Sequence, residues 1–260
     1  MSNAITATPA CATPFRYEAD MIPSLRRDLP RMAFGHRVGI DVKVFAEVPS
    51  VAGVPDLAGV RFDARAIQAR REGEVRPLAT EAEVKAVLAI TSGPLQIGEL
   101  ARRIRRSPDY VRRAVVPLLI QQGWVTEVDG LVRRRGEARW IAQRVVTVEA
   151  KLRDWTKAIG QARRQQMSAD AAYIALDASG MRSITPHLDR VAEGGVGVIA
   201  VDSQSQRSRV LVRPRRIQPE RTLVGRMLIA ERCLEMWGRG QMNGQIYPVF
   251  GWTVPELTQD

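Results

Sequence analysis

The N-terminal part of the chain changes from a helical to a strand-like pattern of apolar positions. Between Tyr17 and Met32, apolar side chains recur at helical spacing, which predicts a short helix. From His36 to Val48, valine and isoleucine alternate with polar or small residues, as in a half-buried strand. A loop at 49–53 and a second apolar run over Val54–Phe62 complete a predicted β-hairpin. The Arg- and Glu-rich stretch Arg65–Pro77 predicts a linker or a short helix.

Residues 79–136 carry three short helical patterns followed by a hairpin pattern. Thr80 and Glu83 form a capping box at the start of the first helix. Ser107 and the proline after it supply an N-cap and a first-turn proline for the third helix. Asp129-Gly130, between two short apolar runs, predicts the tight turn of a hairpin. Helices and hairpin in this order predict a winged helix.

The third helix of this segment is expected to be amphipathic. Its apolar positions 111, 114, 115 and 118 are predicted to face inward. The outward side is then left to Asp109, Arg112, Arg113 and Val116. Pro117 lies within the helix and has no N–H to donate, so it is expected to kink or end the helix.

Arginine is concentrated in the predicted winged helix, which indicates DNA binding. Arg112 and Arg113 could reach the major groove, while arginines of the wing could follow phosphates. The residues expected to contact DNA are Arg102, Arg103, Arg105, Arg106, Arg112, Arg113, Arg133, Arg134 and Arg135. The alternative is a winged helix that makes only protein contacts, in which these arginines are ordinary solvated side chains.

The second half of the chain alternates strands with helices, which predicts an α/β core. The strands are expected at Arg144–Leu152, Ala171–Leu176, Val196–Val201 and Arg207–Arg216. The helices are expected at Trp155–Gln166, Ile184–Ala192 and Glu220–Trp237. A run of this kind favours a sheet with helices packed on its faces.

The composition is that of a globular protein with a basic bias. Hydrophobic residues make up 45% and charged residues 26% of the chain, and the formal net charge is +11. This charge favours a polyanionic partner such as nucleic acid over an acidic small molecule. No apolar run approaches the roughly 18 residues needed to cross a bilayer, so we expect a cytoplasmic protein without membrane contact. Cys11 and Cys233 are isolated in sequence, which argues against a structural zinc site or a disulfide framework.

Two acids and a lysine form the strongest candidate for chemistry. Asp56 stands at the start of one predicted strand, and Glu149-Ala150-Lys151 lies in another that is followed by a helix. Residues two apart in a strand share a face, so Glu149 and Lys151 should project together, with Val148 and Ala150 on the opposite face. Asp56, Glu149 and the Ala150 carbonyl could supply the oxygen ligands that Mg²⁺ or Mn²⁺ prefers. An acid two residues before a lysine also occurs at positions 41 and 83, but only Lys151 has this setting.

This arrangement resembles the PD-(D/E)xK nuclease family. Asp56 matches the first metal-binding acid of that family, Glu149 the second, and Lys151 the lysine near the attacking water. Glu18 stands where some members, including archaeal Holliday-junction resolvases, carry an acid on a helix. Gln161 matches a glutamine that some members carry after the lysine, although the aromatic residue that follows it in those members is replaced here by glutamine.

The resemblance implies a restriction-endonuclease-like mixed sheet flanked by helices, with the winged helix inserted between core strands. The expected parts are core residues 15–78, the winged helix 79–136, core residues 137–216, and a C-terminal helix and tail at 217–260. The implied activity is Mg²⁺-dependent cleavage of DNA, in which a homodimer is possible because double-strand cleavage often needs two sites. In the alternative, the protein is a DNA-binding regulator or scaffold with an inactive core. Apart from the family resemblance, the three residues have a purely structural alternative, in which Glu149 and Lys151 form a surface ion pair and Asp56 caps a turn.

Overall fold

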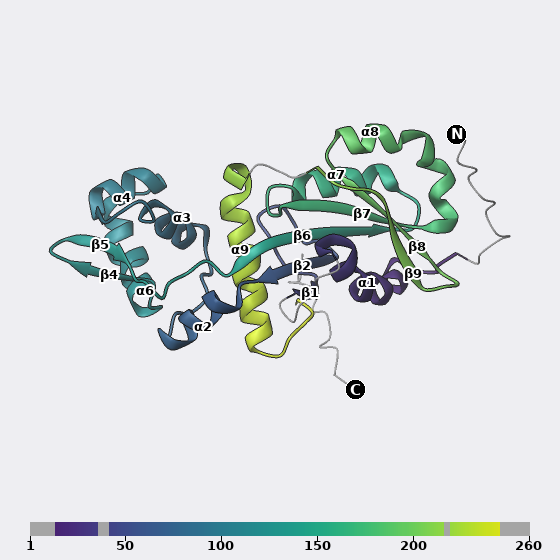
Figure 1. Ribbon diagram of the computed structural model, residues 1–260. Helices are drawn as coiled ribbons and strands as arrows, with labels where there is room; N and C mark the ends of the chain where they lie inside the picture. Colours follow the sequence, from purple (N-terminus) through teal and green to yellow (C-terminus); the bar gives the residue numbers. More distant parts are fainter. Residues whose placement is uncertain (1–13, 36–41, 216–218, 245–260) are drawn as a thin grey trace, which may run out of the picture.

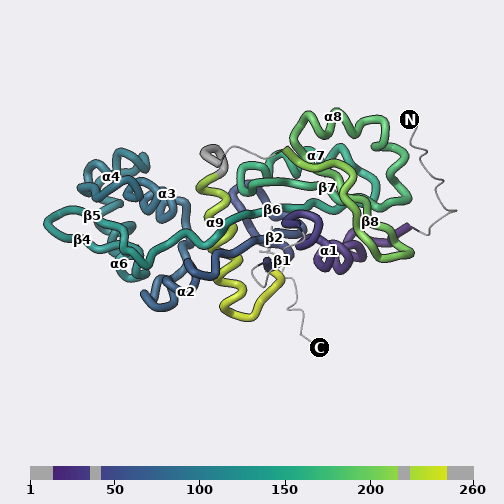
Figure 2. Tube along the Cα trace, viewed as in Figure 1, coloured from purple at the N-terminus to yellow at the C-terminus, as the bar shows by residue number. Residues whose placement is uncertain are grey.

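The computed structural model describes residues 14–35, 42–215 and 219–244 (Figure 1). The chain is mixed α/β and elongated, with a large sheet-containing core and a smaller helical lobe at one end. Two connecting segments run between the core and the lobe, one before α3 and one before β6 (Figure 2). No helix in the described ranges is long and apolar enough to cross a membrane.

The core is built on a six-stranded mixed sheet with the order β1-β2-β6-β7-β8-β9. The central strands β6, β7 and β8 run parallel, whereas β1, β2 and β9 pair antiparallel to their neighbours. The strand bounds are Val42–Ala46 (β1), Leu57–Phe62 (β2), Ala142–Lys151 (β6), Ala171–Asp177 (β7), Gly197–Asp202 (β8) and Arg207–Val212 (β9). The first predicted strand is therefore confirmed from Val42 onward, and its residues 36–41 lie outside the described ranges.

The strands of this sheet carry apolar side chains on both faces, so helices cover both faces. A 3₁₀ turn, Glu18–Met21, leads into α1 (Ile22–Phe34), which packs on one face. The opposite face is covered by α7 (Trp155–Gln165) and α8 (Leu188–Glu193). Within β7, Tyr173 belongs to the α1 cluster and Ile174 to the α7 cluster. The helix predicted from Ile184 starts later, because its first residues form 3₁₀ turns.

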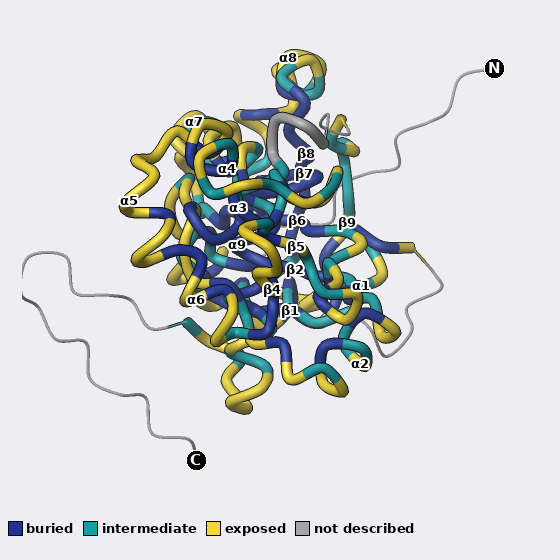
Figure 3. Tube along the Cα trace, turned by 90° about the vertical axis from the view of Figure 1, so that its left-hand side faces the viewer, coloured by how far each residue is buried: buried dark blue, intermediate teal, exposed yellow. Residues whose placement is uncertain are grey.

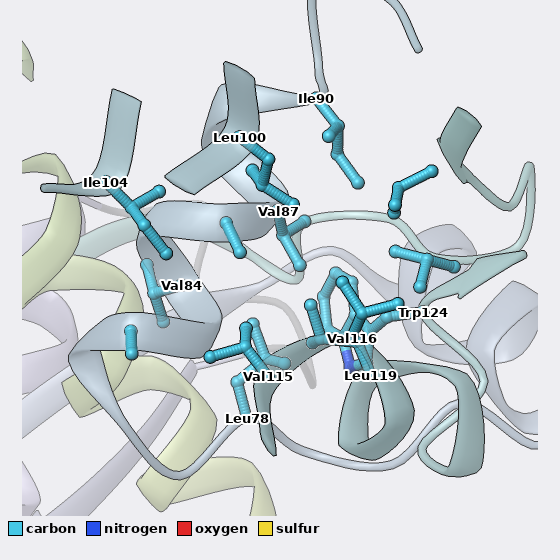
Figure 4. Packing of buried hydrophobic residues seen from close by; sticks show 14 of the residues in the cluster. Leu78, Val84, Val87, Ile90, Leu100, Ile104, Val115, Val116, Leu119 and Trp124 are labelled. Carbon is cyan, nitrogen blue, oxygen red and sulfur yellow. The ribbon is translucent and has the colours of Figure 1, made fainter. Parts of the chain in front are cut away.

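The lobe contains a short three-stranded sheet, β3-β5-β4, and a group of helices. Its elements are α3 (Glu81–Ala89), β3 (Leu95–Gln96), α4 (Ile97–Ile104), α5 (Pro108–Tyr110), α6 (Val116–Gln121), β4 (Val125–Val128) and β5 (Leu131–Arg134). Trp124 is fully buried, and Leu78, Val87 and Leu119 lie in the same cluster (Figure 4). The predicted N-cap at Thr80 is present, since Glu83 N donates to Thr80 Oγ1 over 3.3 Å. The Glu83 carboxylate accepts from Ala79 N and Thr80 Oγ1, so only the Thr80 half of the predicted capping box is seen. Asp129 and Gly130 both have positive φ, as a tight hairpin turn requires.

The third helix of the lobe differs from the prediction around Pro117. A π-helical turn, Val111–Val115, lies between α5 and α6. Because Pro117 cannot donate the regular i→i−4 bond, the ladder widens there and the inward face shifts by about one residue. Val116 is consequently buried, whereas Ala114 and Leu118 are exposed, so the prediction that Ala114 and Leu118 face inward and Val116 outward was wrong.

The long helix α9 (Pro219–Gly238) joins the lobe to the core, together with α2 (Ala64–Glu72). Leu228 packs into the lobe cluster, while Ile229 packs against β1, β2 and β6. Arg70 of α2 donates to both carboxylate oxygens of Glu231 over 2.7 and 2.6 Å, and both side chains are buried. The same guanidinium lies 4.2 Å from the ring centre of Trp124. The C-terminal helix is therefore a shared part of both cores.

Candidate active site

The antiparallel pairing of β2 with β6 brings Asp56 next to residues that are remote in sequence. Leu57 pairs with Val148, so Asp56 lies beside the last residues of β6. Its Oδ2 accepts a hydrogen bond of 2.6 Å from the backbone N–H of Ala150. The first acid is thus held by the strand that carries the other two candidate residues.

Glu149 points to the α7 side of the sheet and is only 2% exposed. Its Oε2 accepts a hydrogen bond of 2.7 Å from Gln165 Nε2, and its Oε1 lies 3.3 Å from Lys151 Nζ. Val148 and Ala150 belong to the α1 cluster on the opposite face. The predicted division of these four residues between the two faces of β6 is therefore confirmed.

Lys151 links the acids through its ammonium group. In addition to its contact with Glu149, Nζ donates to Glu18 Oε2 over 2.9 Å and to the Ala150 carbonyl oxygen over 2.8 Å. Glu18 comes from the 3₁₀ turn before α1, so this cation joins that turn to the end of β6. Two of these three partners, Glu149 and Ala150, are residues that the sequence analysis predicts as metal ligands.

The acids of this cluster repel one another. Burial raises the pKa of Asp56, although the Ala150 N–H and the Lys151 charge oppose the rise. Burial and the nearby Asp56 also raise the pKa of Glu149. Burial works against the charge of Lys151, but the hydrogen bond to Glu18 and the charges of the acids outweigh it and raise the lysine pKa. The charge of Lys151 therefore does not bring the pKa of either acid back to its ordinary value, and a second cation near the acids would lower both values.

Glu47 is a further acid at this site that the sequence analysis did not select. It follows β1, has a φ of 54°, and donates its backbone N–H to the Asp56 carbonyl. Burial and the charge of Asp56 raise its pKa. Glu47 stands in the predicted hairpin next to a loop, and no motif distinguishes it from other surface acids, so only the pairing of β1 with β2 brings it here.

A cavity of about 740 Å³ opens beside the cluster. Its lining includes Glu18, Glu47, Asp56 and Ala150, together with residues of α1 and residues 243–244. The three acids of this lining and Ala150 come from separate segments, which meet at one end of β2 and β6. The cavity is large enough to admit part of a ligand the size of a nucleotide.

The residues fit a hard divalent cation such as Mg²⁺ or Mn²⁺. Asp56, Glu149 and the Ala150 carbonyl offer only oxygen ligands, and a bound cation would oppose the rise in the pKa of the two acids that burial causes. In the described ranges, no three His, Cys, Asp or Glu side chains are already grouped as a metal site. A metal would therefore be held by two carboxylates and a carbonyl, with the remaining ligands supplied by substrate or water.

The two glutamines of α7 have different surroundings. Gln165, one turn after Gln161, is the one that donates to Glu149. The Oε1 of Gln161 is buried without a hydrogen-bond partner in the described part of the chain. Because the two residues are four apart, both lie on the sheet-facing side of α7, and helical periodicity alone could have identified Gln165 as the second candidate.

The arginines predicted to bind DNA lie on the lobe, outside the acid cluster, and differ in their partners. Arg102 and Arg103 each lie 2.8 Å from Glu99, and their hydrogen bonds lower the pKa of Glu99 to about 2. Arg113 lies 3.4 Å from Asp109, and Arg135 lies 3.6 Å from Glu137. The others form no ion pair with any residue that the structure describes: Arg105, Arg106, Arg112, Arg133 and Arg134. Figure 3 looks onto the lobe and shows that α5 is exposed.

Neither the scan against protein-family models nor the search of curated proteins finds a match to this chain. The geometry of the site therefore carries the functional argument.

Proposed function

We propose that this protein is a metal-dependent DNA endonuclease. The observation that supports this function best is the meeting of Asp56 with Glu149, Ala150 and Lys151 at one end of β2 and β6. These residues come from parts of the chain separated by the whole lobe, yet they share one hydrogen-bonded cluster beside a cavity. Buried acids next to a lysine at the edge of a cavity are typical of catalytic sites rather than of surface ion pairs.

Asp56, Glu149 and the Ala150 carbonyl would hold Mg²⁺ or Mn²⁺ at this site. When bound, such an ion polarises the scissile phosphate and lowers the pKa of a water molecule. Gln165 keeps the Glu149 carboxylate in place through its 2.7 Å hydrogen bond. Lys151, held by Glu18, supplies a compact positive charge that orients the attacking water and offsets charge on the phosphate.

We also propose that the core is restriction-endonuclease-like and that the lobe is an inserted winged helix that binds DNA. The element order of the lobe and its β3-β5-β4 sheet support this. Arg112 and Arg113 are exposed on the third helix, and Arg133 is exposed on the hairpin. The lobe would then supply affinity while the acid cluster supplies the chemistry.

The test is cleavage of labelled duplex, branched and single-stranded DNA in Mg²⁺, Mn²⁺ or chelator. We expect at least one DNA form to be cut with either ion and none to be cut in chelator. Absence of cleavage in every form, by folded protein that binds DNA, would reject the nuclease.

A second candidate function is a DNA-binding regulator or scaffold with an inactive core. The observation that favours it is the position of Lys151 Nζ, which donates to Glu18 and the Ala150 carbonyl and lies 3.3 Å from Glu149, so that one lysine joins these groups. A cluster closed in this way can be purely structural. Salt-sensitive DNA binding without metal-dependent cleavage would identify this function.

A further inference from the structure

One cation on the wall of the catalytic cavity has no role in the site described so far. Arg26 lies on α1 and lines the same cavity as Asp56 and Glu18. Its NH2 group donates to Asn243 Oδ1 over 2.5 Å and to the Met242 carbonyl oxygen at 3.5 Å. The guanidinium is therefore oriented by a segment from the far end of the chain.

The hydrogen-bonding capacity of Arg26 is only partly used. Its Nε is buried and finds no acceptor among the described residues, and its side chain forms no ion pair with them. Burial also lowers the pKa of its guanidinium. The neighbouring Arg27 differs, because its Nε lies 2.9 Å from Asp28 Oδ1 and its charge is matched there. Arg26 is thus a half-buried cation that has no ion-pair partner within the described ranges.

The segment that holds Arg26 is itself fixed against the sheet. Ala46 N donates to the Met242 carbonyl over 2.9 Å, and Gly244 N donates to the Ala46 carbonyl over 2.7 Å. Gly244 passes so close to the backbone of Glu47 that an added Cβ would overlap its carbonyl oxygen. A side chain is therefore excluded at position 244. This packing positions Asn243, and through it Arg26, beside the acids.

An anion is the ligand that this arrangement lacks. A guanidinium carries five N–H donors in a planar fork, and a phosphate can accept two of them side by side. Glu18, Glu47 and Asp56 in the same cavity would repel a DNA strand unless a cation opposed them. Turning the guanidinium from Asn243 toward the cavity would give its Nε–H an acceptor as well.

We propose that Arg26 binds a backbone phosphate of the DNA strand next to the phosphate that is cut. This inference rests on the proposed nuclease function and assigns a strand-binding position within its cavity. Arg26 would hold the strand in register over the acids and offset their repulsion. Arg26 would strengthen binding of the DNA backbone to the same extent for any base sequence, because a phosphate contact does not read bases.

The first test measures DNA binding without chemistry. A fluorescein-labelled DNA form that the wild type binds is titrated in chelator at several salt concentrations, with wild type, Arg26→Ala and Arg31→Ala. Arg31 is the matched control, because it is exposed on the same helix and is not among the residues that line the cavity. Loss of one phosphate contact should lower the slope of log K against log salt by about 0.9 for Arg26→Ala alone. Equal slopes for wild type and Arg26→Ala would overturn the inference.

The second test locates the phosphate. After the cut is mapped, single methylphosphonates that remove one backbone charge are placed at each position beside it. At one position the substitution should weaken binding of wild type and of Arg31→Ala about tenfold and leave Arg26→Ala unchanged. A response of Arg26→Ala that equals the wild-type response at every position would overturn the inference.

Two controls distinguish failure of the Arg26 proposal from misfolding of the variant and from failure of the nuclease proposal. Thermal unfolding reports whether Arg26→Ala is folded. If it is not, Arg26→Lys replaces it, because lysine keeps the charge but cannot make the paired contact of a guanidinium. Arg26→Lys should then show a smaller loss of binding than the wild type at the sensitive methylphosphonate position. Binding by wild type without any cleavage would reject the nuclease, while the salt slopes would still decide the role of Arg26. Absence of DNA binding by the wild type would overturn both proposals.

Discussion

Gln165 is predicted to set the charge state of Glu149, and its replacement by leucine tests this directly. Gln165 is 3% exposed, and its Nε2 donates to the Glu149 carboxylate over 2.7 Å. Its Oε1 is buried and has no partner in the described residues. Leucine has a similar volume and removes both the donor and the unsatisfied oxygen, so the fold should tolerate the change.

The expected shift follows from the strength of the lost bond. A hydrogen bond to a charged group contributes about 1.5–3 kcal/mol, and one pKa unit corresponds to about 1.4 kcal/mol. Because the bond favours the ionised carboxylate, its removal should raise the pKa of Glu149 by about one to two units. This adds to the rise already caused by burial and by Asp56. The acid limb of the pH dependence of cleavage should move upward by a similar amount.

The assay is a carbon-13 NMR titration of glutamate carboxyl carbons, supported by the pH profile of cleavage. The matched control is Gln161→Leu, one turn away on the same helix, whose Oε1 has no described partner. Only Gln165→Leu should move the Glu149 resonance. An unchanged or lowered Glu149 pKa in Gln165→Leu, or an equal rise in Gln161→Leu, would refute the reasoning.

Three further predictions concern stability and binding. Because the pKa values of Asp56 and Glu149 are raised in the folded chain, stability should fall as pH rises from the ordinary carboxyl range near pH 4 through the raised values. Asp56→Asn and Glu149→Gln should therefore raise the thermal midpoint at pH 8, measured by calorimetry, and a lower midpoint in both would contradict this. Arg70→Ala should lower the free energy of unfolding in urea by about 3–5 kcal/mol, because it leaves a buried carboxylate unpaired, and a loss below about 1 kcal/mol would oppose that account. Arg112→Ala and Arg113→Ala should weaken DNA binding and reduce its salt slope, and unchanged titrations would exclude that helix from the interface.

Local features of the fold could be predicted from sequence because short-range chemistry determines them. The Thr80 N-cap and the Asp129-Gly130 turn depend on neighbouring residues alone. The alternation of Glu149 and Lys151 against Val148 and Ala150 depends only on the two-residue period of a strand. For the same reason, Glu149 and Lys151 could be placed on one face of β6 before their partners were known.

Features that depend on contacts between distant segments could not be predicted in this way. Pro117 was expected to kink its helix, but which residues then face inward depends on how the widened turn packs on Trp124 and α3. Glu47 reaches the acids only through strand pairing, and Asn243 reaches Arg26 only because its segment pairs with β1. The choice between Gln161 and Gln165 depends on the exact placement of α7 against β6. Periodicity specifies a face but not the residue that makes the contact.

The central claim is that Asp56 and Glu149 together hold the ion that cleaves DNA. The most direct test is single-turnover cleavage in Mg²⁺ by wild type, Asp56→Asn and Glu149→Gln, with DNA binding measured in parallel in chelator. Asp189→Asn is the control, since Asp189 is an exposed acid on α8, away from the cluster. Each amide variant replaces a charged ligand with a neutral one, so the account predicts cleavage by wild type and Asp189→Asn, and loss of cleavage with retained binding in the other two. Equal cleavage by all four proteins would contradict it.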